Sequence, residues 1–234
     1  MEFSFTDLLL LPLIAVTVST HEFSHGWMAS LLGDPTAKER GRMTLNPLKH
    51  LSWKYTLVLP VLLYVATLGR FAFGFAKPVP INPLRLRSYS RGWKRPFADM
   101  IWVGLIGPVV NLAIAGLVAL VVLSGIIPET GAGRAVLDLA YIMILFNLLL
   151  GMVNLLPVPP LDGSRLLIGL LPRRHAVRIL RYELIVFVGL IAALAVISIL
   201  AGGIQNVVLP PLRWAWTVLG LDPAHFDQLL SPGG

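Results

Sequence analysis

The sequence predicts an all-α membrane protein that crosses the bilayer with about five to six transmembrane helices. Apolar residues make up 56% of its 234 residues and charged residues only 13%, whereas a soluble domain carries about 25% charged residues. Several apolar runs reach the length of about 20 residues that a spanning helix needs. Because so few charges cannot cover a water-facing surface, we expect one integral-membrane domain over residues 1–221 and a C-terminal tail over residues 222–234.

The predicted membrane helices follow these apolar runs. The first covers residues 8–32 and ends at the helix-breaking sequence Gly33-Asp34-Pro35. Further spans are expected at residues 100–127, 135–157 and 184–201. The shorter run 207–221 contains a Pro-Pro pair, and we expect a tilted or interfacial helix there, with Trp214 and Trp216 as interfacial anchors.

Residues 55–75 form a weaker apolar run that contains Pro60 and Arg70 and has basic segments on both sides. Basic loops favour the cytoplasmic face of a membrane, so we expect this run to be re-entrant and to return to the same face. Non-helical backbone at membrane depth requires an internal cavity or surrounding protein. Short membrane-associated β-strands are expected around residues 39–45, and the phenylalanines at 71, 73 and 75 also alternate with a strand-like period.

The basic residues predict the orientation of the chain. The 19 Lys and Arg residues are concentrated in residues 33–97 and 165–181, and Arg134 falls on the opposite face. This distribution places the N-terminus outside and the large basic loop in the cytoplasm. It also accounts for the net charge of +7, so no nucleic-acid partner is expected.

Three ionisable residues interrupt the first apolar run within five positions. They lie in His21-Glu22-Phe23-Ser24-His25, which fits the pattern H-E-x-x-H. Residues i and i+4 share a helix face, so both imidazoles can reach one metal ion, and Glu22 can accept a proton from a bound water. Chance matches to this pattern occur, but a charge at the centre of a membrane helix costs about 2.5–3.5 kcal/mol on insertion scales. A metal ion would offset that cost, so the sequence predicts a zinc site with Glu22 as general base.

A catalytic zinc ion usually has three protein ligands, and the chain has no cysteine. The third ligand is therefore expected to be an Asp, Glu or His near the depth of the two histidines. The candidates are Asp99, Asp138, Asp162, Glu183 and His175. Asp162 is favoured because it follows a proline-rich break at the cytoplasmic end of the span 135–157, and Gly163 permits a tight turn beside it.

Three motifs together carry a family resemblance. They are His21-Glu22-x-x-His25, Gly107-Pro108-x-x-Asn111 and Asn154-x-x-Pro157-x-Pro159-x-Leu161-Asp162-Gly163, and the segments 41–50 and 77–83 add to them. The chain resembles the site-2 protease family of intramembrane zinc metalloproteases, in the small prokaryotic branch without a PDZ or nucleotide-sensing domain. The resemblance covers a core of residues 8–170.

The resemblance implies one Zn²⁺ held by His21, His25 and Asp162, with Glu22 as general base. It also implies a multi-pass protein of a prokaryotic cell membrane, with the active site toward the cytoplasmic half. Its expected partners are the lipid bilayer and a membrane-anchored protein substrate that is cleaved in or near its transmembrane segment. The substrate's identity and the oligomeric state stay open.

Three further polar residues are candidates for contacts to substrate or to the oxyanion. Asn111 and Asn154 are amides within apolar spans, where they could donate to a substrate carbonyl or hold helices together. His50 could stabilise an oxyanion or could be a solvated loop histidine.

Two other functions are compatible with ionisable residues in a membrane. A metal or proton transporter would place such residues along its route, but the chain has no internal repeat of the kind that many transporters show. An inactive scaffold that binds membrane proteins would not need Glu22.

Overall fold

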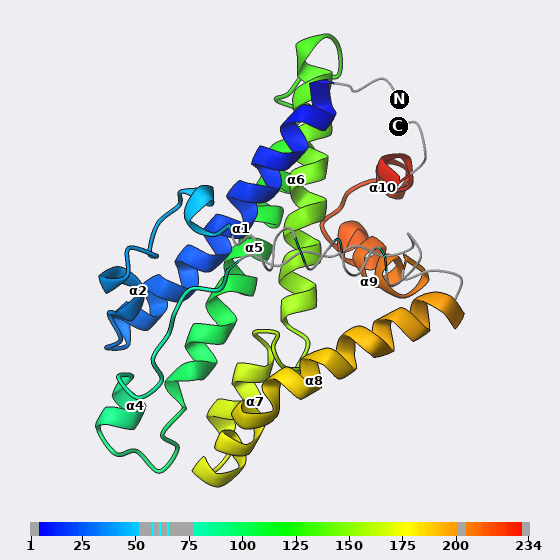
Figure 1. Ribbon diagram of the computed structural model, residues 1–234. Coiled ribbons are helices and arrows are strands. Elements are labelled where there is room, and N and C mark those ends of the chain that lie inside the picture. The colour runs from blue at the N-terminus through cyan, green and yellow to red at the C-terminus, as the bar shows by residue number, and fades with distance from the viewer. Residues whose placement is uncertain are drawn as a thin grey trace.

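The computed structural model describes residues 5–51, 58, 61, 65, 77–200 and 205–230 of the chain. These residues are mostly helical, as predicted (Figure 1). The elements are α1 (Phe5–Leu31), α2 (Thr36–Glu39), the 3₁₀ turn η1 (Pro47–Lys49), α4 (Arg87–Ser90), α5 (Asp99–Leu123), α6 (Ala132–Asn154), α7 (Ser164–Leu170), α8 (Arg173–Leu200), α9 (Gln205–Val218) and α10 (Pro223–Leu230).

Helices α1, α5 and α6 pack side by side and form the centre of the molecule (Figure 1). Buried side chains of α5 and α6, such as Ala115, Ile144 and Leu148, make one apolar core. A second core joins the end of α1 to α5 and α7 through Leu32, Met100 and other buried residues. The second core holds the end of α1 and α7 against α5, so residues from both can meet beside it.

Two helices in the described part of the chain are long and apolar enough to cross a membrane. They are α5, with a mean hydropathy of 2.5, and α6, with a mean hydropathy of 2.2. Large apolar side chains of α5, among them Leu117 and Leu120, are more than 60% exposed, and burying them in lipid would remove this apolar surface from water.

Helices α1 and α8 coincide with the predicted spans 8–32 and 184–201. Helix α8 begins earlier than expected, at Arg173, so the basic stretch 173–181 is its first part. Arginine is a good helix former, and the chain continues as one helix into the apolar run. In Figure 1, α8 extends away from the bundle.

The expectation of short β-strands is not supported, since the structure assigns no strand to any residue that it describes. Around residues 39–45 the prediction is wrong. The chain there leaves α2 through Gly41, which has a positive φ of 61°, and Asn46 then accepts a hydrogen bond from the backbone N–H of Leu48 and caps η1. Local turns and caps therefore use the backbone groups that a strand would pair.

The predicted re-entrant segment, residues 55–75, lies outside the described residues apart from positions 58, 61 and 65. The alternating phenylalanines at 71, 73 and 75 also lie outside them.

Helix α9 has 14 residues, which is too short to span a membrane. Trp214 is 66% exposed, as an interfacial anchor would be, but Trp216 is fully buried. The indole of Trp216 packs against Tyr141 and Phe226. The prediction of Trp216 as an anchor is therefore wrong, because residues 223–230, expected in the tail, form α10 and cover it.

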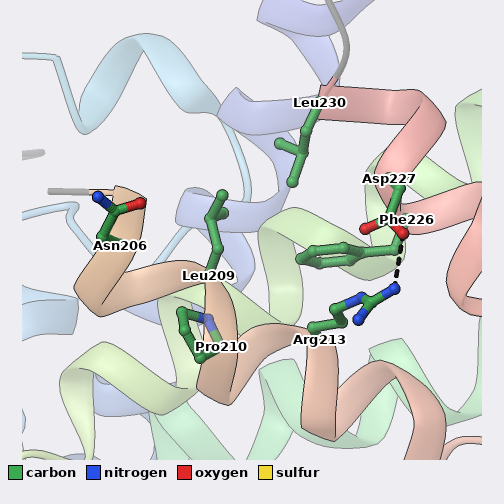
Figure 2. A pocket seen from close by; sticks show the side chains of 7 residues that line it. All are labelled: Asn206, Leu209, Pro210, Arg213, Phe226, Asp227 and Leu230. Atoms are coloured by element: carbon green, nitrogen blue, oxygen red, sulfur yellow. Dashed lines mark hydrogen bonds and ion pairs between the residues drawn. The ribbon is translucent and has the colours of Figure 1, made fainter. Parts of the chain in front are cut away.

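A cavity of about 590 Å³ lies between α9 and α10 (Figure 2). Leu209 on α9 and Phe226 on α10 contribute apolar walls, and Arg213 bonds Asp227 across the cavity at 2.6 Å. None of the predicted site residues lines this cavity, so the predicted site lies elsewhere in the molecule.

Candidate metal centre

His21, His25 and Asp162 lie together beside α5. The histidines share one face of α1, are 4% and 6% exposed, and have their Nε2 atoms 3.0 Å apart. Asp162, in the turn between α6 and α7, places Oδ2 2.9 Å from Nε2 of His21 and 3.1 Å from Nε2 of His25. The structure thus brings together three predicted ligands from both ends of the core sequence.

The outer ring nitrogens of both histidines face hydrogen-bond acceptors. Nδ1 of His25 lies 2.6 Å from the carbonyl oxygen of Val103, and Nδ1 of His21 lies 2.8 Å from Oδ1 of Asn111. A carbonyl oxygen can only accept, so His25 carries a proton on Nδ1. A neutral His25 therefore points the lone pair of Nε2 toward His21 and Asp162.

This donor set fits a zinc ion. Two imidazole nitrogens and a carboxylate oxygen are common zinc ligands, and their separations in a tetrahedral site are about 3.4 Å. The observed separations of 2.9–3.1 Å need to open by only a few tenths of an ångström. A proton could bridge one pair of these atoms, whereas a cation bound by all three satisfies them together.

The electrostatics of Asp162 favour positive charge at this point. Burial by itself would raise the pKa of the Asp162 carboxyl. When no metal is bound, a positive charge on His25 and hydrogen bonds from both imidazoles outweigh burial and hold this pKa well below its usual range. Asp162 is therefore a carboxylate at neutral pH.

Two glycines of α5 make room for the cluster. A Cβ atom on Gly107 would lie 2.5 Å from Nε2 of His25 and 2.8 Å from Cε1 of His21, and one on Gly104 would lie 2.7 Å from the carbonyl oxygen of Asp162. Real Cβ contacts are essentially never this short. The bare backbone of α5 therefore forms one wall of the site.

Gly163 turns the chain so that Asp162 faces the histidines, but the reason differs from the one expected. Its φ is −57°, a value open to other residues. A Cβ atom there would lie 2.2 Å from the carbonyl oxygen of Leu155, and its N–H donates to the carbonyl of Asn154 at 2.6 Å. Close packing of the turn, rather than left-handed backbone, requires glycine at this position.

Glu22 lies beside the cluster, on the wall of a second cavity. This cavity has a volume of about 100 Å³ and is also lined by His25, Val79, Asp162 and Arg165. Oε2 of Glu22 accepts a hydrogen bond from the backbone N–H of Val79 at 2.8 Å. That bond fixes the direction of the carboxylate next to a space large enough for water.

The structure places the three secondary candidates differently. Asn111 contacts the cluster directly through His21. Nδ2 of Asn154 donates to the carbonyl of Leu150 at 2.9 Å within its own helix. His50 is buried, and its Nε2 lies 2.8 Å from the carbonyl oxygen of Thr44. A contact of Asn154 or His50 with substrate stays a prediction.

The other candidate third ligands are engaged away from the cluster. Asp99 accepts from the backbone N–H of Ser88 at 2.7 Å. Asp138 pairs with Arg134 at 3.3 Å, and Glu183 pairs with Arg165 at 2.9 Å.

The remaining candidate, His175, lies in the first turn of α8. Among the described residues, the one group with metal-ligand geometry is His21, His25 and Asp162.

Two residues that the sequence did not single out also belong to this region. Asn147 of α6 is fully buried and bonds Asn111, and Thr17, 2% exposed, bonds Asn147. The available signal was an amide in the middle of an apolar run, the same signal that drew attention to Asn111. Thr17 lies four residues before His21 and so shares its helix face.

Comparisons with known proteins place the chain among peptidases. The family model described as Peptidase family M50 matches residues 123–197, a stretch that contains Asp162. The chain is 37% identical over 178 residues to the "Putative zinc metalloprotease YwhC" of Bacillus subtilis, a match that covers 73% of this chain and 74% of that protein.

Two mycobacterial relatives are longer. The chain is 32% identical to the "Putative zinc metalloprotease Rip2" of Mycolicibacterium smegmatis and 33% identical to Rip2 of Mycobacterium tuberculosis. Each match covers 63% of this chain and 51% of the relative, so the chain matches about half the length of these proteins. No solved structure gave a significant match.

Proposed function

The chain belongs to peptidase family M50, and on that basis we propose that it is a zinc metalloprotease that cleaves membrane-anchored proteins in or near their transmembrane segment. One observation carries the proposal: the Nε2 atoms of His21 and His25 and Oδ2 of Asp162 converge within 3.1 Å of one another. These side chains would hold one Zn²⁺, which supplies Lewis acidity when bound.

Glu22 is the general base of the proposed reaction. Its carboxylate takes a proton from the attacking water and passes it to the leaving amine. The hydrogen bond from Val79 holds this carboxylate at the wall of the 100 Å³ cavity, which it shares with His25 and Asp162. Water and the scissile carbonyl would meet in this cavity.

The membrane arrangement follows from the helices and the charges. Helices α5 and α6 are long and apolar enough to cross a membrane, and with α1 and α8 as two further spans the chain would be a multi-pass protein. The N-terminus lies outside, and His21 and His25, in the second half of α1, lie toward the cytoplasmic half. A site at this depth is suited to substrates within the membrane.

The test measures zinc content and cleavage together on purified protein in detergent. The wild type should hold about one zinc ion per chain and cleave peptides from a panel of single-span transmembrane sequences, and Asp162→Ala should lose both. Asp138→Ala removes a carboxylate that pairs with Arg134 instead and should lose neither. A wild type without zinc under saturating supply contradicts the proposal, and zinc without cleavage of any peptide points to a transporter or a scaffold.

Glu22→Gln separates the base from the metal site. The amide keeps an oxygen that can accept from Val79 but cannot take a proton, so zinc content should stay near the wild-type value. Cleavage should fall by about 10²–10⁴-fold, the usual contribution of a general base. Cleavage at the wild-type rate would remove Glu22 from this role.

A further inference from the structure

A chain of buried hydrogen bonds begins at a backbone carbonyl of α6 and ends at His21. Nδ2 of Asn147 donates to the carbonyl oxygen of Met143 at 2.8 Å. Because that oxygen can only accept, the bond fixes which end of the Asn147 amide is nitrogen. Oδ1 of Asn147 must then accept from Nδ2 of Asn111, at 2.9 Å. The carbonyl of Met143 thus determines the orientation of two amides in sequence.

The orientation of Asn111 determines the tautomer of His21. With Nδ2 turned to Asn147, Asn111 presents Oδ1 to Nδ1 of His21 at 2.8 Å. The imidazole must carry its proton on Nδ1, and Nε2 keeps its lone pair for a metal ion. The second N–H of Asn147 reaches Oγ1 of Thr17 at 3.2 Å. Since Asn111 and Asn147 are 0% exposed, bulk water does not compete with these bonds.

We propose that Asn147 is a positioning residue of the metal centre, which sets the orientation of Asn111 and thereby holds His21 in the tautomer that binds metal. The inference rests on the proposed zinc site. Without an acceptor at position 147, the Asn111 amide can turn over and present an N–H to His21. The ring proton then moves to Nε2, where it blocks the ligand atom.

The first variant is Asn147→Leu, which has a similar volume and no hydrogen-bonding atoms. Its dissociation constant for Zn²⁺, measured by competition with a chelator in detergent, should rise about 10–100-fold. Asn147→Ala removes the same acceptor with less crowding and has the same expected result, so a folding failure of one variant leaves the test intact.

Two control variants separate this role from packing. Ser19→Ala removes a buried hydroxyl that also donates to the carbonyl four residues earlier, and it should leave zinc affinity unchanged. Asn147→Asp loses amide donors but keeps an acceptor for Asn111, so it should bind zinc within about threefold of the wild type. A packing role predicts the opposite order, because leucine is apolar whereas aspartate places an ionisable carboxyl in a buried site.

The outcomes distinguish the inference from the proposed function. A wild type that binds no zinc overturns both. A wild type that binds zinc, with Asn147→Leu and Asn147→Ala binding it equally well, overturns the positioning role alone. Weak zinc binding by Asn147→Leu and Asn147→Ala, together with near-wild-type binding by Asn147→Asp, supports the positioning role of Asn147.

Discussion

At Gly107, the absence of one methyl group sets how closely α5 approaches the two imidazoles. The wall of the site at this position is backbone, and a Cβ atom would occupy space next to Nε2 of His25. The same reasoning applies to Gly163, whose missing side chain lets the turn pack against Leu155. At Gly163 the short contact is with backbone atoms, which cannot rotate away, whereas at Gly107 it is with the imidazoles, which would have to move.

Gly107→Ala is therefore expected to weaken zinc binding at least tenfold, because the added methyl group displaces His25 from the position that it needs. Gly116→Ala is the matched control on the same helix, where a Cβ atom meets nothing within 4 Å. The measurements are the zinc affinity and the thermal unfolding midpoint of Gly107→Ala and Gly116→Ala. Equal zinc affinity for the two variants would contradict this account of the wall.

At the residue scale, the sequence predicted the three side chains that the structure brings together, His21, His25 and Asp162. The helical period put His21 and His25 on one face, and the absence of cysteine narrowed the third ligand to a few carboxylates and a histidine. Asn147 was not predicted, since its partners lie on two other helices. Which side chains meet between helices depends on how each helix is rotated in the bundle, and the sequence pattern does not contain that rotation.

At the scale of elements, the extended segment of residues 77–83 is held to α1 at two points. Glu22 accepts from the backbone N–H of Val79, and Asp34, in the turn after α1, accepts from the backbone N–H of Asn82 at 2.5 Å and from that of Thr36 at 3.0 Å. Asp34 is 0% exposed. The segment that positions the proposed base is thus anchored by a buried carboxylate.

Asp34→Ala should lower the free energy of unfolding by about 1–3 kcal/mol, because it leaves buried N–H groups without an acceptor. Cleavage should fall as well, while zinc content stays unchanged, since Asp34 does not touch the ligands. Glu39→Ala, which removes an exposed partner of Arg85, should cost less than about 1 kcal/mol. Thermal unfolding in detergent measures the stability of both variants. Equal losses of unfolding free energy would contradict the role of Asp34 as the buried anchor of residues 77–83.

The elements that the sequence predicted well are the long apolar helices, whose existence follows from length and composition alone. The strands around residues 39–45 were predicted wrongly, because their basic and turn-forming residues were interpreted from the local pattern alone. Gly41 and Asn46 instead satisfy the backbone locally. The burial of Trp216 was also missed, since it depends on α10 folding back over α9.

At the scale of the whole molecule, the proposed arrangement places the two ends of α5 on opposite faces of a membrane. This helix has 25 residues and is about 37 Å long, enough to cross the hydrocarbon core. Composition predicted the membrane protein, and the basic segments predicted its orientation. The re-entrant path of residues 55–75 stays a prediction, since these residues lie almost entirely outside the described part of the chain.

The orientation can be tested with single cysteines, because the chain contains none of its own. Glu129→Cys lies between α5 and α6, and Ser90→Cys lies at the end of α4; both positions are exposed. In intact cells, a membrane-impermeant maleimide should label position 129 and should label position 90 only after the membrane is opened. The reverse pattern would invert the topology, and equal labelling would contradict a crossing by α5.

The distance along the chain between His21 and Asp162, 141 residues, has a consequence for biosynthesis. A ribosome adds about 5–20 residues per second, so the first helix waits roughly 7–28 s for its carboxylate partner to be made. In the proposed arrangement, His21, Glu22 and His25 are during that interval in the membrane without the groups that later surround them, at a cost of a few kcal/mol. A nascent chain that ends before α6 should therefore be a preferred target for membrane quality control, whereas one that ends after α7 should be stable.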